Sequence, residues 1–96
     1  MNLEIKKDLA SNWFKILQDA ICDDISKFEK NKFKFKSTTW KRSSEKDEGG
    51  GEYRILKNGK VFEKVGVNFS EVYGKFPKKF QKNIPGAQKD PRFWAS

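Results

Sequence analysis

The sequence predicts an α+β fold in which one long helix precedes a set of antiparallel strands. Three patterns predict it: apolar residues recur at steps of three and four over residues 3–28, aromatic and basic residues alternate over 32–41, and Asn58-Gly59 divides residues 52–67. A period near 3.6 is typical of an amphipathic helix, and a period of two is typical of a strand. Asn-Gly is typical of a tight turn between antiparallel strands.

The apolar residues of the predicted helix form one stripe along its length. Residues three and four positions apart lie on the same side of a helix, so this stripe indicates a helix that packs on a sheet. A role at a membrane surface is disfavoured, because acidic residues dilute the polar side of the helix. The stripe consists of Leu9, Trp13, Ile16, Leu17, Ala20, Ile21, Ile25 and Phe28.

The predicted hairpin has a register that its turn determines. Both central residues of a type I′ turn need a positive φ, and Asn58-Gly59 supplies them. Arg54 would then stand opposite Glu63, an exposed pair of opposite charge that contributes about 0.2–1 kcal/mol. Both faces carry apolar pairs, so we expect one to pack on the helix and the other on a second subunit or a neighbouring segment. The expected pairs are Lys57 with Lys60, Leu56 with Val61, Ile55 with Phe62, and Arg54 with Glu63.

The rest of the chain is predicted to form connections and short elements. Residues 43–48 are polar and charged, which predicts a loop, and Gly49–Gly51 closes it. The triplet lacks the Gly-Lys-Ser/Thr ending of a phosphate cradle, and the carboxylate of Glu52 would repel phosphate. Two interpretations remain: a flexible approach to a strand, or close passage of backbone past a ligand or a neighbouring chain. Residues 67–72 can extend the second hairpin strand, and 78–83 can form a helical turn.

Composition limits the chemistry that the chain can perform. The 96 residues fit one domain at most and carry 21 Lys and Arg against 13 Asp and Glu, a net charge of +8 that favours anionic partners. The absence of histidine and the single cysteine, Cys22, exclude a Cys/His zinc site and an intrachain disulfide. No apolar run approaches the roughly 20 residues of a membrane span, and no signal-peptide core is present. The expected location is the cytoplasm.

A basic and aromatic segment, Lys32–Arg42, suggests a second hypothesis. Aromatic rings stack on bases and lysines neutralise phosphates, so this interleaving is typical of modules that bind single-stranded nucleic acid. No ribonucleoprotein signature or other nucleic-acid module accompanies it. The competing interpretation is an ordinary strand whose aromatic side faces the core while its lysines are solvated. Nucleic-acid binding therefore stays the alternative.

One stretch is more specific than these patterns. Residues 48–70 resemble the oxygen-dependent (aerobic) coproporphyrinogen III oxidase family, for which the run 61–64 followed by 66–70 is a hallmark. The chain departs from the family at Glu52, where a further glycine is common, and near Tyr73, where a histidine is common. No chemical role is therefore assigned to Tyr73. The motif residues are Gly49, Gly50, Gly51, Gly66, Val67, Asn68, Phe69 and Ser70.

Further pieces that resemble the family occur in the expected order. They are residues 17–22 on the predicted helix, Trp40 with Arg42 before the glycines, and Gly74 after the hallmark. The resemblance covers essentially the whole chain and about the first third of a family member. It implies that this α+β piece opens a larger antiparallel sheet flanked by helices.

The resemblance also implies an activity and an assembly. The family converts coproporphyrinogen III to protoporphyrinogen IX by oxidative decarboxylation of two propionates, with oxygen as co-substrate and no metal or organic cofactor. Its catalytic residues are expected beyond Ser96, so none is assigned here, and the 96 residues alone are expected to be inactive. The family works as a homodimer. The residues assigned to the dimer interface are Ile55, Leu56, Lys57, Asn58, Gly59, Lys60, Val61, Phe62, Glu63 and Lys64.

Overall fold

A computed structural model describes residues 2–29 and 35–96 and confirms the α+β class. The first element is helix α1, Leu3–Phe28, whose bounds coincide with the periodic segment. The side chain of Asn2 caps it by accepting a hydrogen bond from the backbone N–H of Ile5 at 2.9 Å. Lys27 lies in the last turn, where a positive charge is favourable.

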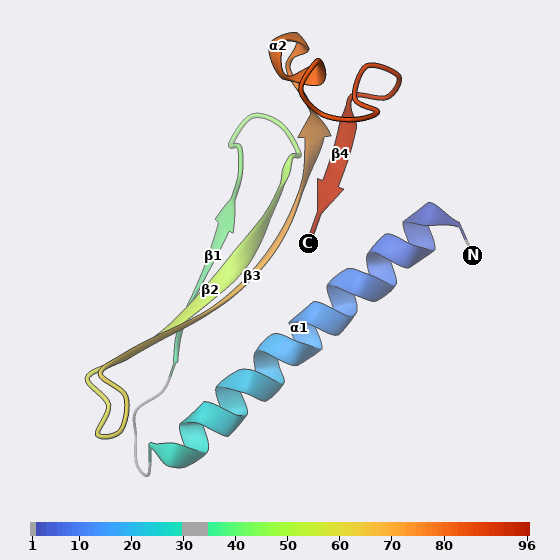
Figure 1. The fold of residues 1–96 in the computed structure, drawn as a ribbon. Helices are drawn as coiled ribbons and strands as arrows, with labels where there is room; N and C mark the ends of the chain where they lie inside the picture. Colours follow the sequence, from blue (N-terminus) through green and yellow to red (C-terminus); the bar gives the residue numbers. More distant parts are fainter. Residues whose placement is uncertain (1, 30–34) are drawn as a thin grey trace.

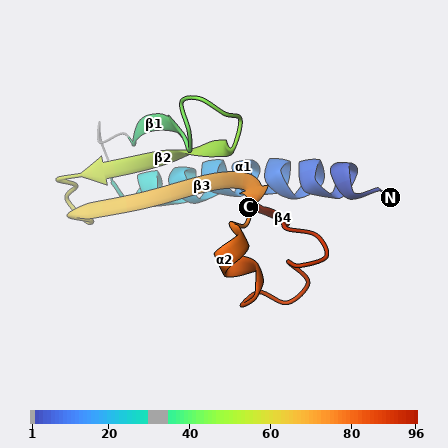
Figure 2. The ribbon, with the colours of Figure 1, turned by 90° about the horizontal axis from the view of Figure 1, so that it is seen from above.

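Four antiparallel strands follow the helix and form one sheet in sequence order. They are β1, Lys36–Lys41; β2, Gly49–Lys57; β3, Lys64–Lys75; and β4, Arg92–Ala95. A short helix, α2, Lys78–Gln81, lies between β3 and β4 as predicted. Figure 1 shows a strongly bent sheet with α1 running along one side, and Figure 2 shows the same arrangement from above.

Two strands differ from the sequence prediction. The first predicted strand covers 32–41, of which residues 32–34 lie outside the described part; β1 occupies Lys36–Lys41. β4 was not predicted, because its four residues are too short for an alternation to stand out. It pairs with the end of β3, from Val72 opposite Ala95 to Lys75 opposite Arg92.

The predicted hairpin register is wrong. Lys57 pairs with Lys64, so a six-residue connection replaces the expected two-residue turn, and Arg54 faces Val67 rather than Glu63. Asn58 has the expected positive φ of 57°, but Gly59 does not adopt one, and a type I′ turn needs both. The backbone N–H of Asn58 instead donates to the carbonyl of Glu63 at 2.8 Å, which closes the longer loop.

The longer loop is held by Glu29, the residue that follows α1. Its carboxylate accepts hydrogen bonds from the backbone N–H groups of Lys60, Val61 and Phe62 at 2.7, 2.9 and 2.6 Å. Glu29 is only 3% exposed. Successive N–H groups that converge on one anion form a nest, and here the anion belongs to the protein. These three donors therefore bind the helix end instead of continuing the ladder with β2.

Most of the apolar stripe of α1 is left exposed, contrary to expectation, and of its members Leu17 and Ile21 line a cleft against β3. The buried residues of the helix are Ser11, Gln18 and Cys22, which form a narrow, mostly polar strip. Trp13 is 58% exposed, and most of the stripe is exposed with it. The strip meets the sheet because its small and polar groups bind strand atoms directly. The exposed apolar residues of α1 are Leu3, Ile5, Leu9, Trp13, Phe14, Ile16, Leu17, Ile21 and Phe28.

Gln18 makes the central contact between helix and sheet. Its Nε2 donates to the carbonyl oxygens of Glu52 and Val67, each at 3.0 Å, so one side chain joins α1 to both β2 and β3. Ser11, nearer the N-terminus of α1, adds a second link, because its hydroxyl donates a hydrogen bond to the carboxylate of Glu71 at 2.7 Å. These bonds explain why the polar strip is the most deeply buried side of α1.

We expect Gln18→Leu to lower the free energy of unfolding by about 2 kcal/mol, because two backbone acceptors lose their donor while the volume is kept. Urea unfolding followed by circular dichroism measures the change. Asn12→Leu, on the exposed side of the same helix, is the control and should change stability by less than about 0.5 kcal/mol. Equal effects of both variants would contradict the role of Gln18.

Candidate functional site on the open face of the sheet

The face of the sheet opposite α1 carries the candidate site. Directly paired residues of an antiparallel sheet point to the same face, so the register identifies the side chains there. Among the described residues no helix or strand lies over the middle of this surface, which is called the open face below (Figure 2). Its two central rows are Thr38, Tyr53 and Asn68, and Trp40, Gly51 and Ser70.

The open face contains a hollow of about 350 Å³. Aromatic rings of Trp40 and Tyr53, the ammonium of Lys64, and the polar side chains of Asn68 and Ser70 surround it. Such a set offers stacking surfaces, hydrogen-bond donors and a positive charge to a ligand. The full lining is Trp40, Tyr53, Ile55, Lys64, Gly66, Asn68, Phe69 and Ser70.

The glycine triplet belongs to strand β2, not to a loop. Gly49, Gly50 and Gly51 pair with Val72, Glu71 and Ser70, so the two groups of motif residues, 49–51 and 66–70, lie on adjacent strands. A Cβ at Gly51 would stand 2.0 Å from the carbonyl oxygen of Phe69, and one at Gly50 would stand 2.2 Å from that of Trp40. The backbone that passes close to the glycines therefore belongs to neighbouring strands of the same chain. Passage past a ligand or a neighbouring chain, the interpretation made from the sequence, stays a prediction.

The opposite face carries a network of charges beneath α1. Arg54 lies 2.6 Å from the carboxylates of both Asp19 and Glu52. The hydrogen bond from Arg54, helped by one from Ser37, lowers the pKa of Glu52. Burial raises the pKa of the Cys22 thiol, although Arg54 partly opposes that effect. The predicted helix pieces at Asp19 and Cys22 thus meet β2 through one guanidinium, which fixes the helix on the sheet rather than creating a reactive group.

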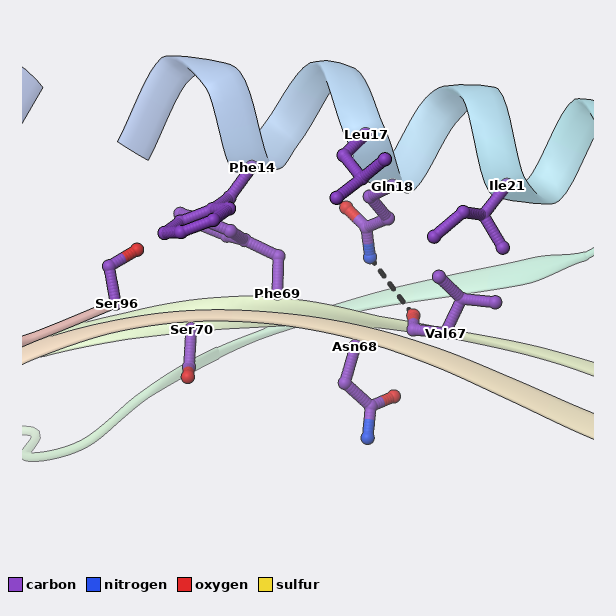
Figure 3. A pocket seen from close by; sticks show the side chains of 9 residues that line it. All are labelled: Phe14, Leu17, Gln18, Ile21, Val67, Asn68, Phe69, Ser70 and Ser96. Carbon is purple, nitrogen blue, oxygen red and sulfur yellow. Dashed lines mark hydrogen bonds between the residues drawn. The ribbon is translucent and has the colours of Figure 1, made fainter. Parts of the chain in front are cut away.

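An apolar cleft of about 240 Å³ lies between α1 and β3 (Figure 3). Phe14, Leu17 and Ile21 of the helix form one wall, and Val67 and Phe69 of the strand form the other. Figure 3 shows Asn68 and Ser70 pointing away from this cleft, toward the open face. The hallmark residues therefore divide by parity: the apolar ones support the helix, and the polar ones face outward.

The described residues contain few clusters of titratable side chains. No group of three or more acidic, cysteine or histidine side chains that could hold a metal occurs within 2–29 and 35–96. The hydroxyl of Tyr73 donates a hydrogen bond to Asp47. This bond, and to a smaller extent burial, raises the pKa of Tyr73.

Within residues 2–29 and 35–96 no helix is long and apolar enough to cross a membrane.

The residues assigned to a dimer interface fall into different surroundings. Leu56 is fully buried under the helix, whereas Val61 is 58% exposed at the loop tip. Lys60 and Phe62 bind Glu29 through their backbone N–H groups. The interface assignment itself stays a prediction.

Comparison with known proteins decides the family. The coproporphyrinogen III oxidase family profile matches residues 10–96, which is nearly the whole chain. The chain belongs to the coproporphyrinogen III oxidase family. Its hallmark residues can therefore be described as family residues on β2 and β3, with the polar ones on the open face. No solved structure matches the chain.

The individual relatives of this chain have names that agree with the family. An oxygen-dependent coproporphyrinogen-III oxidase of Rickettsia felis is 42% identical over 94% of this chain and 34% of its own length. Proteins with the same name from Rickettsia bellii and Rickettsia africae are 44% and 39% identical, over 94% and 100% of the chain and 34% and 36% of their own lengths. The chain thus spans about a third of the length of the curated relatives it matches.

Two structural contributions were not predicted from the sequence. The interpretation of residues 17–22 as a family piece did not reveal that Gln18 bridges two strands, and no local pattern marks Glu29 as the anchor of a loop 31 residues away. The parity of Asn68 and Ser70 was available as a signal. Only the correct strand register, however, shows that these two residues share a face with Trp40.

Proposed function

We propose that this chain forms part of an oxygen-dependent coproporphyrinogen III oxidase, located in the cytoplasm, that converts coproporphyrinogen III to protoporphyrinogen IX. The observation that carries the proposal is the family match over residues 10–96, together with relatives that bear the enzyme's name. The reaction removes two propionates as carbon dioxide and leaves two vinyl groups, with oxygen as the electron acceptor. No metal or organic cofactor is part of the proposal.

The role of this chain in that enzyme is structural support and substrate binding. Its open face offers Lys64, Asn68 and Ser70 beside two aromatic rings, which suits a flat molecule with carboxylate groups. The net charge of +8 favours the approach of a tetracarboxylate. The chemistry requires groups supplied by other parts of the enzyme, and the assembly is expected to be a homodimer.

A chimera tests the proposal. The R. felis relative, with its corresponding third replaced by this chain, should form protoporphyrinogen from coproporphyrinogen III and oxygen without added metal, whereas the 96 residues alone should show no turnover. Product is measured by fluorescence after oxidation to the porphyrin. The unaltered relative is the positive control, and the relative with that third deleted is the negative one. A chimera that matches the relative in circular dichroism and size but forms no product would overturn the proposal.

The nucleic-acid alternative predicts a different result. A basic single-strand binder would hold a labelled oligonucleotide with a steep loss of affinity between 50 and 200 mM salt, roughly tenfold to a thousandfold for several phosphate contacts. Part of the Lys32–Arg42 segment lies outside the described residues, and the part within them, from Lys36 onward, is strand β1 and its end. The family match favours the enzyme over this alternative.

A further inference from the structure

The inner part of β3 has an unpaired edge. β3 extends over Lys64–Lys75, but β4 pairs with it only from Val72 to Lys75. Along residues 64–71, the described part of the chain provides a partner on the β2 side alone. An edge strand of this length presents a row of free N–H and C=O groups and is a template for another strand.

The direction of these free groups follows from two hydrogen bonds at the end of the sheet. The N–H of Tyr73 donates to Glu48 on the β2 side, whereas the N–H of Phe76 donates to Pro91 on the β4 side. Backbone groups alternate along a strand, and the β2–β3 register is continuous without a bulge. The N–H and C=O groups of Gly66, Asn68 and Ser70 therefore point out of the free edge.

β4 already runs along this edge in the correct direction. Its last residues point along the remaining length of β3 (Figure 1), and its register places Ala95 opposite Val72. Continuing that register, the first residue after Ser96 stands opposite Ser70 and the sixth opposite Val65. Trp94 lies on the helix side, because its Nε1 donates to Glu71, which also accepts from Ser11 on α1. Every second residue from Ser96 onward therefore faces α1.

The apolar cleft of Figure 3 lies where those helix-facing residues would go. Ser96 lines one end of it, and the walls are Phe14, Leu17 and Ile21 above Val67 and Phe69. The second and fourth residues after Ser96 would stand opposite Phe69 and Val67, beneath the helix. Phe14, Leu17 and Ile21 are each about two-fifths exposed, so apolar surface remains for them to bury.

We propose that the edge of β3 from Lys64 to Glu71, with the cleft beneath α1, is the docking site of an extended segment that continues β4. The occupant alternates, with apolar side chains at the second, fourth and sixth positions after Ser96 and polar ones between them. The continuity of β4 favours this occupant over a second copy of the chain. The curated relatives are about three times as long, so the family has chain to supply the segment.

The test adds six residues to Ser96 in two arrangements of identical composition. Thr-Val-Thr-Val-Thr-Val places its valines under α1, whereas Val-Thr-Val-Thr-Val-Thr turns them to the open face, because a shift of one residue exchanges the faces. We expect the first extension to raise Tm by about 5–10 °C over the unextended chain, and the second to raise it far less. Backbone amide exchange at Gly66, Asn68 and Ser70 should slow by about tenfold or more in the first extension only.

A second variant keeps the proposal falsifiable. Phe14→Ala removes part of the cleft wall and should abolish most of the gain from the first extension while changing the unextended chain little. Equal gains from both extensions, or unchanged exchange at the three amides, would overturn the proposal. Protection that appears in the unextended chain and grows with protein concentration would also overturn it, because a second copy would then occupy the edge.

Discussion

Gly51→Ala is expected to destabilise the chain by about 3 kcal/mol, because the added Cβ would stand 2.0 Å from the carbonyl oxygen of Phe69. The neighbouring atom is backbone, which cannot rotate away, so the two strands must separate. Because small domains are only marginally stable, such a loss is a large fraction of their total free energy of unfolding. Urea unfolding measures the change, and two-dimensional NMR shows whether the sheet persists.

Gly66→Ala is the matched control for this prediction. It is another glycine among the motif residues and lies on β3, but the nearest atom to its added Cβ is Asn68 Oδ1 at 3.9 Å. We expect it to be neutral or to stabilise the chain by about 0.4–1 kcal/mol through the unfolded state. A Gly51→Ala variant as stable as Gly66→Ala would show that the strands can give way, and would refute the packing argument.

Glu29→Gln should lower Tm by about 10 °C, because an amide cannot accept all three of the N–H groups that the carboxylate binds. Hydrogen exchange at Lys60, Val61 and Phe62 should accelerate together. Glu45→Gln removes the same charge from an exposed loop position and should leave both measurements unchanged. Loss of Tm without faster exchange at the three amides would contradict the anchoring role.

The same residue predicts a dependence on pH. Burial alone would raise the pKa of Glu29, but the N–H groups of Phe62, Val61 and Lys60 outweigh it and lower that pKa below the ordinary 4.5. A lowered pKa in the folded chain contributes stability above pH 4.5, and this contribution is lost as pH falls through the folded value. Glu29→Gln should therefore flatten the acid limb of the stability curve. It should not abolish it, since Arg92 lowers the pKa of Asp90 to about 2.

Local patterns predicted the elements well, because helix periodicity and strand alternation depend on neighbours in sequence. The range 3–28 and the presence of a hairpin needed nothing else. The hairpin register failed because Asn58-Gly59 competes with Glu29, a residue whose proximity no local pattern reveals. The prediction for the helix stripe failed for a different reason. Periodicity shows which side of α1 is apolar, but it does not show which surface covers that side.

The candidate site was likewise predictable in part: its residues could be identified from the sequence, but their arrangement could not. The resemblance identified the two groups of motif residues, 49–51 and 66–70, and the structure placed them on adjacent strands. The open face could not be predicted, because the row of Trp40, Gly51 and Ser70 exists only in the observed register. The glycines do pass close to other backbone, which only a missing side chain permits, but this backbone belongs to strands of the same chain and not to the ligand or neighbouring chain named from the sequence.

The anchoring of the β2–β3 loop by Glu29 has a consequence for how the chain folds. A hairpin with a self-sufficient turn can form within microseconds by itself, but this loop leaves three N–H groups unmet until the end of α1 arrives. The closing contacts join residues 31 to 33 positions apart. The entropy lost in closing so long a loop must therefore be offset early in folding, before the hydrogen bonds between the strands stabilise the hairpin. Helix and hairpin should therefore enter the transition state together, and a Glu29 variant should slow folding rather than hasten unfolding.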